Sequence, residues 1–157
     1  MPGPADLTES AAMWANPAVY AMIGGRVFTR EEVWQRLLRY IGHWHVLGYG
    51  GWTVRETASG RLVGDVTLMD SRRSTEPSFE GTPEAGWVLA PWAHGRGFAR
   101  EALVAMLGWA DARIPRTVCI IDPANAPSIK LAGKLGYGLV TEATYKDAPT
   151  LLFERNA

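Results

Sequence analysis

Residues 87–110 carry three signals in direct succession: an apolar strand, a glycine-containing turn and an amphipathic helix. The strand pattern Trp87-Val88-Leu89 ends before Pro91. From Gly97 onward, apolar residues recur at the spacing of one helix face: Ala99, Ala102, Leu103, Met106 and Ala110. A strand that leads directly into such a helix requires the helix to cover a sheet, which restricts the chain to folds that contain both.

The remaining segments alternate between helical and strand periodicity, and they predict a single α/β domain over residues 1–157. Thr29 and Glu32 form a capping box that begins a helix, and Asn125 begins another. We expect helices over 5–15, 30–45, from 97 and from 125, and strands at 52–54, 62–69, 87–89, 118–121, 138–145 and 150–154. Residues 70–83 have the composition of a surface loop. Helical crossovers make some strand neighbours parallel, so the sheet is mixed.

Charge and cysteine content exclude several functional classes. Lys plus Arg (16) equals Asp plus Glu (16), which gives no electrostatic reason to bind nucleic acid or an anionic membrane. Cys119 is the only cysteine, so the chain can form neither an internal disulfide nor a cysteine-based metal site. No apolar stretch approaches the roughly 20 residues that span a bilayer, and the N-terminus lacks a signal-peptide pattern. We therefore expect a cytoplasmic protein.

The turn PWAHGRGFAREA, residues 91–102, has the composition of a phosphate-binding turn. The first N–H groups of a helix have no partner within the helix, the helix dipole favours anions there, and glycines let the backbone approach a ligand. Arg96 would add a charged contact, and His94 is either a further phosphate contact or a plain loop residue. Arg100 excludes a dinucleotide-binding fingerprint, and no Gly-Lys-Ser/Thr of a P-loop occurs. An ordinary tight connection is the alternative.

A second segment, DPANAPSIKLAGKLGY at 122–137, makes a family resemblance specific. Residues 84–102 resemble the acetyl-CoA-binding motif of the GNAT acetyltransferases, and Asn125-x-x-Ser128 resembles the segment that follows it. Within that superfamily, Glu84-x-Gly86-Trp87 is similar to the ribosomal-protein N-terminal acetyltransferase branch. The resemblance implies a mixed, largely antiparallel sheet with helices on both faces.

The resemblance also implies a binding mode for acetyl-CoA as cosubstrate, without a metal ion. The strand backbone at Trp87, Val88 and Leu89 would pair with the pantetheine arm. Asn125 and Ser128 would lie along the same arm. The pyrophosphate would be held by amides of Gly95, Arg96, Gly97, Phe98 and Ala99.

Three positions depart from the family pattern. Trp92 stands where many members have Gln or Arg, and Ala132 stands where many have the tyrosine that protonates the coenzyme thiolate. Members of this branch also open with an additional strand, and nothing of that kind precedes Pro4. Either the start is internal to a longer reading frame, or a partner chain, such as the second copy in a homodimer, covers the exposed sheet edge.

These residues predict an N-acetyltransferase that moves an acetyl group directly to a primary amine, either a protein N-terminus or a small molecule. Glu84 is the candidate general base, with Glu80 as its competitor. Ser128 either protonates the thiolate or serves only as a first-turn helix residue. Cys119 has no charged sequence neighbour to activate it, which disfavours a covalent intermediate. The alternatives are a non-catalytic acetyl-CoA sensor and an interaction module.

Overall fold

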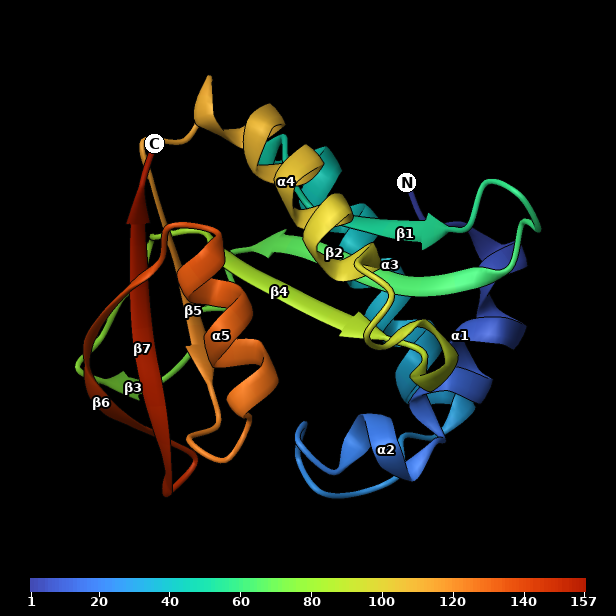
Figure 1. Ribbon diagram of the computed structural model, residues 1–157, viewed down its shortest axis with the longest axis horizontal. Coiled ribbons are helices and arrows are strands. Elements are labelled where there is room, and N and C mark those ends of the chain that lie inside the picture. The colour runs from blue at the N-terminus through green and yellow to red at the C-terminus, as the bar shows by residue number, and fades with distance from the viewer. The chain divides into compact units, whose positions relative to one another are not determined.

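The computed structural model describes residues 1–157, and its strands form a seven-stranded sheet in the order β1-β2-β4-β5-β7-β6-β3 (Figure 1). The strands are β1 (Gly51–Arg55), β2 (Leu62–Met69), β3 (Thr75–Glu76), β4 (Glu84–Leu89), β5 (Arg116–Ile121), β6 (Gly138–Tyr145) and β7 (Ala148–Asn156). The helices are α1 (Leu7–Trp14), α2 (Pro17–Tyr20), α3 (Arg30–Leu47), α4 (Phe98–Asp111) and α5 (Ala126–Lys134), with 3-10 turns η1 (Pro4–Asp6) and η2 (Pro91–Ala93).

Strand directions confirm the predicted mixed, largely antiparallel sheet. The pairs β1–β2, β3–β6, β5–β7 and β6–β7 are antiparallel, whereas β4 and β5 are parallel with Glu84 opposite Val118. Parallel neighbours need a long crossover connection, and α4 supplies it between β4 and β5. The strand, turn and helix over residues 84–111 are therefore part of the connection that makes the sheet mixed.

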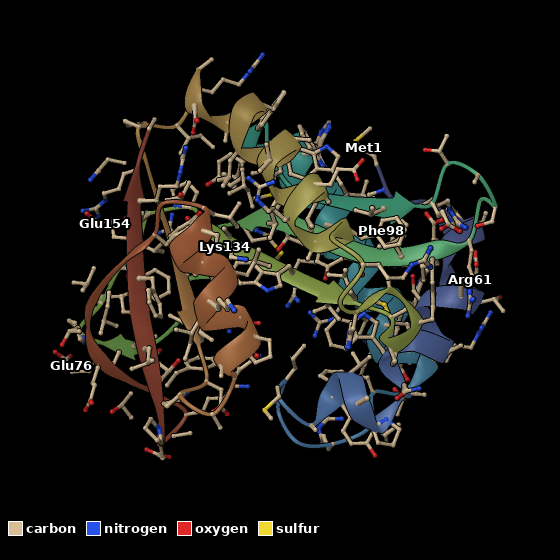
Figure 2. All side chains as sticks on the ribbon, in the orientation of Figure 1. Met1, Arg61, Glu76, Phe98, Lys134 and Glu154 are labelled. Carbon is tan, nitrogen blue, oxygen red and sulfur yellow. The ribbon has the colours of Figure 1, made fainter.

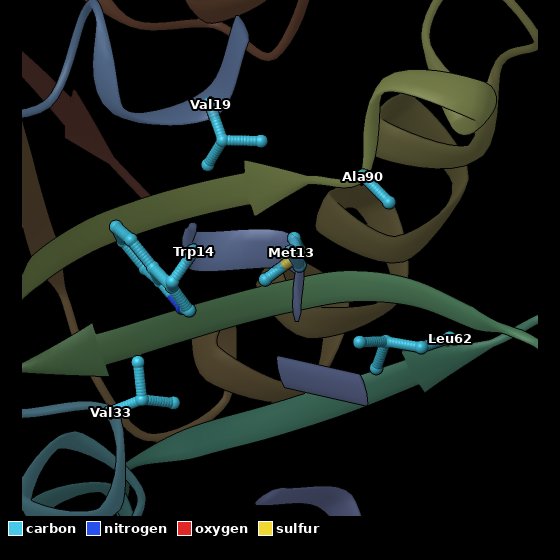
Figure 3. Close-up of a cluster of buried hydrophobic side chains, with 6 residues drawn as sticks. All are labelled: Met13, Trp14, Val19, Val33, Leu62 and Ala90. Atoms are coloured by element: carbon cyan, nitrogen blue, oxygen red, sulfur yellow. The ribbon is translucent and has the colours of Figure 1, made fainter. Parts of the chain in front are cut away.

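The chain forms two compact units, of which the first comprises Met1–Met69 and Gly86–Ala102. In this unit β1 and β2 form a hairpin, with β1 at one edge of the sheet. Helix α3 packs on both strands and crosses behind them in Figure 1, and α1 packs on α3 and β2. Figure 3 shows the apolar cluster of this unit, to which α2 and the residue that follows β4 also contribute. It consists of Met13, Trp14, Val19, Val33, Leu62 and Ala90.

The second unit comprises Asp70–Ala85 and Leu103–Ala157. Strands β5, β7 and β6 lie side by side in that order, and β3 pairs with β6. Lys146 and Asp147 have φ of 52° and 60° and connect β6 to β7 through a tight turn. The buried residues Val118, Ala143 and Leu152 form an apolar cluster here. The single domain expected over residues 1–157 stays a prediction.

Local signals in the sequence position the helices as expected. The Thr29 hydroxyl accepts a hydrogen bond from the Glu32 N–H at 3.2 Å, and the Glu32 carboxylate accepts one from the Thr29 N–H at 2.8 Å. This is the predicted capping box at the start of α3. The Asn125 side chain caps α5 by accepting from the Ser128 N–H at 3.2 Å. Gly136 follows α5 with φ of 88°, a left-handed conformation that suits glycine.

The prediction that residues 70–83 form only a loop is wrong at Thr75–Glu76, which is β3. Strand β4 also begins at Glu84, before the apolar residues that predicted it, because the Val118 N–H donates to the Pro83 carbonyl at 3.0 Å. Both differences arise from pairing with strands that are distant in the sequence. Periodicity within a short window carries no information about such pairing.

Candidate acetyl-CoA site

The turn before α4 presents a run of backbone N–H groups with no partner in the chain. Residues 95–100 donate no backbone hydrogen bond, and the first helical bond of α4 runs from the Glu101 N–H to the Gly97 carbonyl at 3.1 Å. Gly95 and Gly97 have φ of 71° and 85°, and a Cβ atom added to either would meet no atom within 4 Å. Open, unpaired amides at a helix N-terminus are what a phosphate group needs, so the residues fit a pyrophosphate.

Trp92 and His94 fix this turn to the neighbouring strands. The Trp92 Nε1–H donates to the Leu62 carbonyl at 3.0 Å, and its ring packs edge-on against Phe98 with centroids 5.7 Å apart. The ring of His94 donates through Nε2 to the Leu89 carbonyl at 3.0 Å. Phe98 is labelled at the start of α4 in Figure 2. The Trp92 side chain thus has a structural role in place of the polar residue that many family members carry there.

Arg96 is already part of an ion pair in the first unit. Its Nη2 atom lies 3.0 Å from Glu56 Oε1, and its guanidinium lies 5.1 Å from the Trp92 ring centroid and 4.9 Å from that of Phe98. The Ser59 hydroxyl and then the charge of Arg96 lower the pKa of Glu56. The side chain is therefore held next to the unpaired amides, and its contact with a phosphate stays a prediction.

The predicted pantetheine-binding residues Trp87, Val88 and Leu89 are half-buried in β4. Strand β2 approaches them closely at Gly64, where an added Cβ would lie 2.1 Å from the Val88 carbonyl oxygen. The Ala90 N–H donates to the Val63 carbonyl at 2.8 Å. Only glycine at position 64 allows the two backbones to approach so closely, and this fixes β4 just before the turn.

In the second unit, Glu84 is a buried member of an ion pair. Its side chain is 8% exposed, and Oε2 accepts from the Nε–H of Arg73 at 2.6 Å. Burial is the largest single effect and lowers the pKa of Arg73, but the hydrogen bond and charge of Glu84 together with Tyr145 outweigh it, so the pKa of Arg73 is raised. The guanidinium also lies 4.8 Å from the centroid of the Tyr145 ring. Sequence reasoning missed Arg73, since it gives no local signal eleven residues before Glu84.

Glu80 and Cys119, two other residues considered for catalysis in this unit, differ in exposure. Glu80, the competing base, is exposed and pairs with Arg72 at 2.6 Å. Cys119 is 1% exposed, and burial together with the charge of Glu84 raises the pKa of its thiol. A thiol with a raised pKa is a poor nucleophile, which agrees with the expectation that no covalent cysteine intermediate forms.

The second motif lies at the start of α5. Asn125 uses its side-chain oxygen as the helix cap, and Ser128 is half-buried in the first turn. Ala132, at the position of the tyrosine found in many family members, is completely buried. Tyr137 is buried too, with its hydroxyl 2.8 Å from that of Thr117, as expected of a packing residue.

Two further observations concern metal binding and membrane insertion. The structure brings together no group of three or more His, Cys, Asp or Glu side chains that could hold a metal ion. None of its helices combines the length and the apolar character that crossing a membrane requires.

Comparison with known proteins identifies close structural relatives. The family model described as an acetyltransferase (GNAT) domain matches residues 2–138. A putative GNAT-family acetyltransferase from Bordetella pertussis is 31% identical with a TM-score of 0.85, over 98% of this chain and 91% of that one. The structure of yncA, a putative acetyltransferase from Salmonella typhimurium with its cofactor acetyl-CoA, is 23% identical with a TM-score of 0.75, over 99% and 90%.

A ribosomal-protein-S5-alanine acetyltransferase from Vibrio fischeri shares the fold, with 19% identity and a TM-score of 0.76 over 97% of this chain and 88% of that one. Among curated sequences, the uncharacterised protein YkkB of Bacillus subtilis is 25% identical over 114 residues, 70% of this chain. The uncharacterised N-acetyltransferase YnaD of the same organism is 36% identical over 59 residues, 36% of this chain. The matches span 64% of YkkB and 35% of YnaD.

Proposed function

Because the chain belongs to the GNAT N-acetyltransferase family, we propose that it transfers the acetyl group of acetyl-CoA directly to a primary amine. The observation that carries this proposal is the run of unpaired amides at residues 95–100, in which Gly95 and Gly97 have left-handed backbone conformations. The Salmonella relative whose structure contains acetyl-CoA supports the choice of cosubstrate.

The amides of residues 95–100 and the guanidinium of Arg96 bind the pyrophosphate in this proposal. Neither group requires a divalent ion, since N–H dipoles and a fixed positive charge supply the electrostatic attraction. The β4 backbone at residues 87–89 holds the pantetheine arm, and Asn125 and Ser128 contact the same arm. Each of these assignments names a contact that coenzyme binding to single-site variants can test.

Acetyl-CoA supplies a thioester, in which the carbonyl carbon is open to attack by a neutral amine. As the C–N bond forms and the C–S bond breaks, the amine must lose a proton and the sulfur must gain one. Glu84 accepts the amine proton directly or through water. Arg73 occupies only Oε2 of Glu84, which leaves Oε1 as the acceptor. Ser128 hydrogen-bonds the thiolate or relays a proton from water to it, because an aliphatic hydroxyl is itself a weak acid.

Calorimetry with acetyl-CoA, combined with an assay for free thiol over a panel of primary amines, tests this function. We expect binding that a chelator leaves unchanged, and thiol release that depends on an amine and yields an N-acetylated product. Binding without transfer to any amine would instead indicate a sensor. Absence of binding would indicate an interaction module. A thermal-shift measurement checks this result, since a ligand at 100 times its dissociation constant should stabilise the fold by about 2.7 kcal/mol.

A further inference from the structure

A groove of about 320 Å³ lies along the first half of α3, within the first unit. Four of its lining residues fall at helical spacings that place them on one face of α3. Phe28, in the segment before the helix, completes the lining. The lining residues are Phe28, Glu32, Gln35, Arg36 and Arg39. This volume lies at the lower end of the range for small-molecule sites, so the groove suits a small ligand.

The charge of this lining is positive, because its only carboxylate is already neutralised. Glu32 accepts hydrogen bonds from Arg26 Nη1 at 3.0 Å and from Arg26 Nη2 at 2.5 Å, in addition to the Thr29 N–H of the capping box. These hydrogen bonds, that of Arg26 first, lower the pKa of Glu32 to about 2. Arg36 therefore contributes a positive charge that no carboxylate of the lining balances.

Arg36 is a cation that is held by aromatic rings and pairs with no carboxylate. Its guanidinium lies 4.0 Å from the Trp14 ring centroid and 5.1 Å from that of Phe28. It forms no salt bridge, and its Nε atom is buried without a hydrogen-bond partner. Stacking uses the faces of the guanidinium plane, whereas all five N–H donors lie in that plane. The rings therefore orient the side chain without using its capacity to bind an anion.

Asp65 is the buried carboxyl whose charge acts on Arg36, and it does not pair with it. It is 1% exposed, and neither of its oxygens makes a hydrogen bond of ordinary geometry. Burial raises the pKa of Asp65 to about 7, and Arg36, Trp14 and Thr53 offset only part of that effect. Near neutral pH this carboxyl is only partly ionised, so the positive charge of Arg36 is not fully balanced within the protein.

Trp14 and Phe28, which hold Arg36, belong to the same apolar cluster that Val88 of β4 packs against. We infer that the α3 groove binds a carboxylate through Arg36, and that the acceptor is a small amine that also carries a carboxylate, as amino acids do. This inference rests on the proposed acetyl transfer and adds the class of acceptor. The planar fork of arginine matches a carboxylate in a bidentate arrangement. A polyamine would instead bring further positive charge close to the guanidinium of Arg36, which no carboxylate pairs with.

Transfer to matched pairs of acceptors tests the inference. The common L-amino acids are compared with the amines obtained from them by decarboxylation. One charged hydrogen-bonded pair corresponds to a preference on the order of 10-fold to 100-fold in kcat/KM for the amino acid. Arg36→Met should remove most of this preference and Arg36→Lys should retain part of it. Arg30→Met, which removes an arginine of the same helix outside the groove, should keep it in full.

A binding measurement separates this inference from the proposed function. In a ¹⁵N NMR spectrum the Nε–H signal of Arg36, assigned by its absence from Arg36→Lys, should shift saturably with an accepted amino acid and not with its decarboxylated partner. Calorimetry with coenzyme A is done on the same samples. If coenzyme A binds but no carboxylate-bearing amine moves this signal, the inference is wrong and the proposed function stands. If carboxylates move it but coenzyme A does not bind, the proposed function is wrong.

Discussion

Glu84 is the side chain on which the proposed chemistry depends most, and its surroundings serve two purposes. The Arg73 guanidinium, 2.6 Å away, balances a carboxylate that burial would otherwise destabilise. The same contact holds the carboxylate in one orientation. A base that is oriented in advance loses less freedom when an amine arrives, so in the proposed mechanism Arg73 is a positioning residue for Glu84.

We predict that Glu84→Gln lowers the rate of acetyl transfer by about 10²-fold to 10⁴-fold, as loss of a general base typically does. Coenzyme affinity should stay nearly constant, because the carboxylate acts on the amine. The measurement is kcat over a pH series together with calorimetry for acetyl-CoA. Glu80→Gln, which removes the exposed carboxylate paired with Arg72, is the control and should have little effect. The opposite result would make Glu80 the base.

We predict that Ser128→Ala lowers turnover only modestly, by less than about tenfold, while acetyl-CoA still binds. The N-cap of α5 should survive, because Asn125 accepts from the backbone N–H of Ser128 and not from its hydroxyl. Turnover is measured under conditions in which chemistry limits the rate. Equal rates in both proteins would leave water as the proton donor. Replacing Ala132 by tyrosine is not a clean rescue, since this position is completely buried.

Sequence reasoning predicted the local backbone conformation at the candidate site. The glycine turn and the Asn125 cap follow from neighbouring residues, and the structure confirms both conformations. Arg73 and Arg36 gave no comparable signal. The first depends on a contact with Glu84 and the second on rings from other segments. Without knowledge of its partners, an arginine in a sequence is predicted to be a solvated surface charge.

At the scale of elements, the turn before α4 depends on the left-handed conformation of Gly97, with φ of 85°. We predict that Gly97→Val weakens coenzyme A binding by at least about tenfold, because the side chain strains the turn and occupies the open side of the amides. Gly60 is a matched control, since it has φ of 71° and equally open surroundings in the β1–β2 turn. Calorimetry of both valine variants separates backbone strain from obstruction of the ligand. Equal losses of affinity would contradict a phosphate site at Gly97.

Several long elements were predicted from the sequence nearly to the residue, whereas β7 (Ala148–Asn156) extends two residues beyond each end of the predicted strand. Strands β2 and β6 and the start of α3 lie where the pattern placed them. Helix α2 was not predicted, since four residues are too few to show a helical period. Strand β3 has only two residues, and these are held by pairing with Tyr145 and Thr144 of β6. Such elements form because of tertiary contacts. These contacts join residues that are too far apart in the sequence for a short window to include both.

At the scale of the whole molecule, Asp65 makes stability depend on pH. Its pKa in the folded protein is about 7, above the ordinary value of 3.8, so the folded state holds a proton that the unfolded state has lost. We predict that the free energy of unfolding falls as pH rises from about 4 to 7, by at most about 1.4 kcal/mol per pH unit from this group, and then levels off. Asp65→Asn should remove this decrease.

Urea denaturation at several pH values measures this effect. Asp111→Asn is the control, because Arg155 lowers the pKa of Asp111, and its contribution changes only at more acidic pH. The contribution of Asp111 to the free energy of unfolding is present at neutral pH and is lost as pH falls. Its pH dependence is therefore opposite in sign to that of Asp65. A decrease between pH 4 and 7 that survives Asp65→Asn would assign it to another group.

The ion pair between Arg96 and Glu56 determines how the molecule would capture its coenzyme. The chain carries equal numbers of acidic and basic side chains, and this pair also balances charge locally beside the turn. If a phosphate displaced Glu56 from Arg96, the arginine would exchange one counterion for another. The gain in binding free energy would then be only the difference between the two ion pairs. Since the net charge is zero, the protein exerts no net attraction on a distant polyanion, and the rate of capture should depend little on ionic strength.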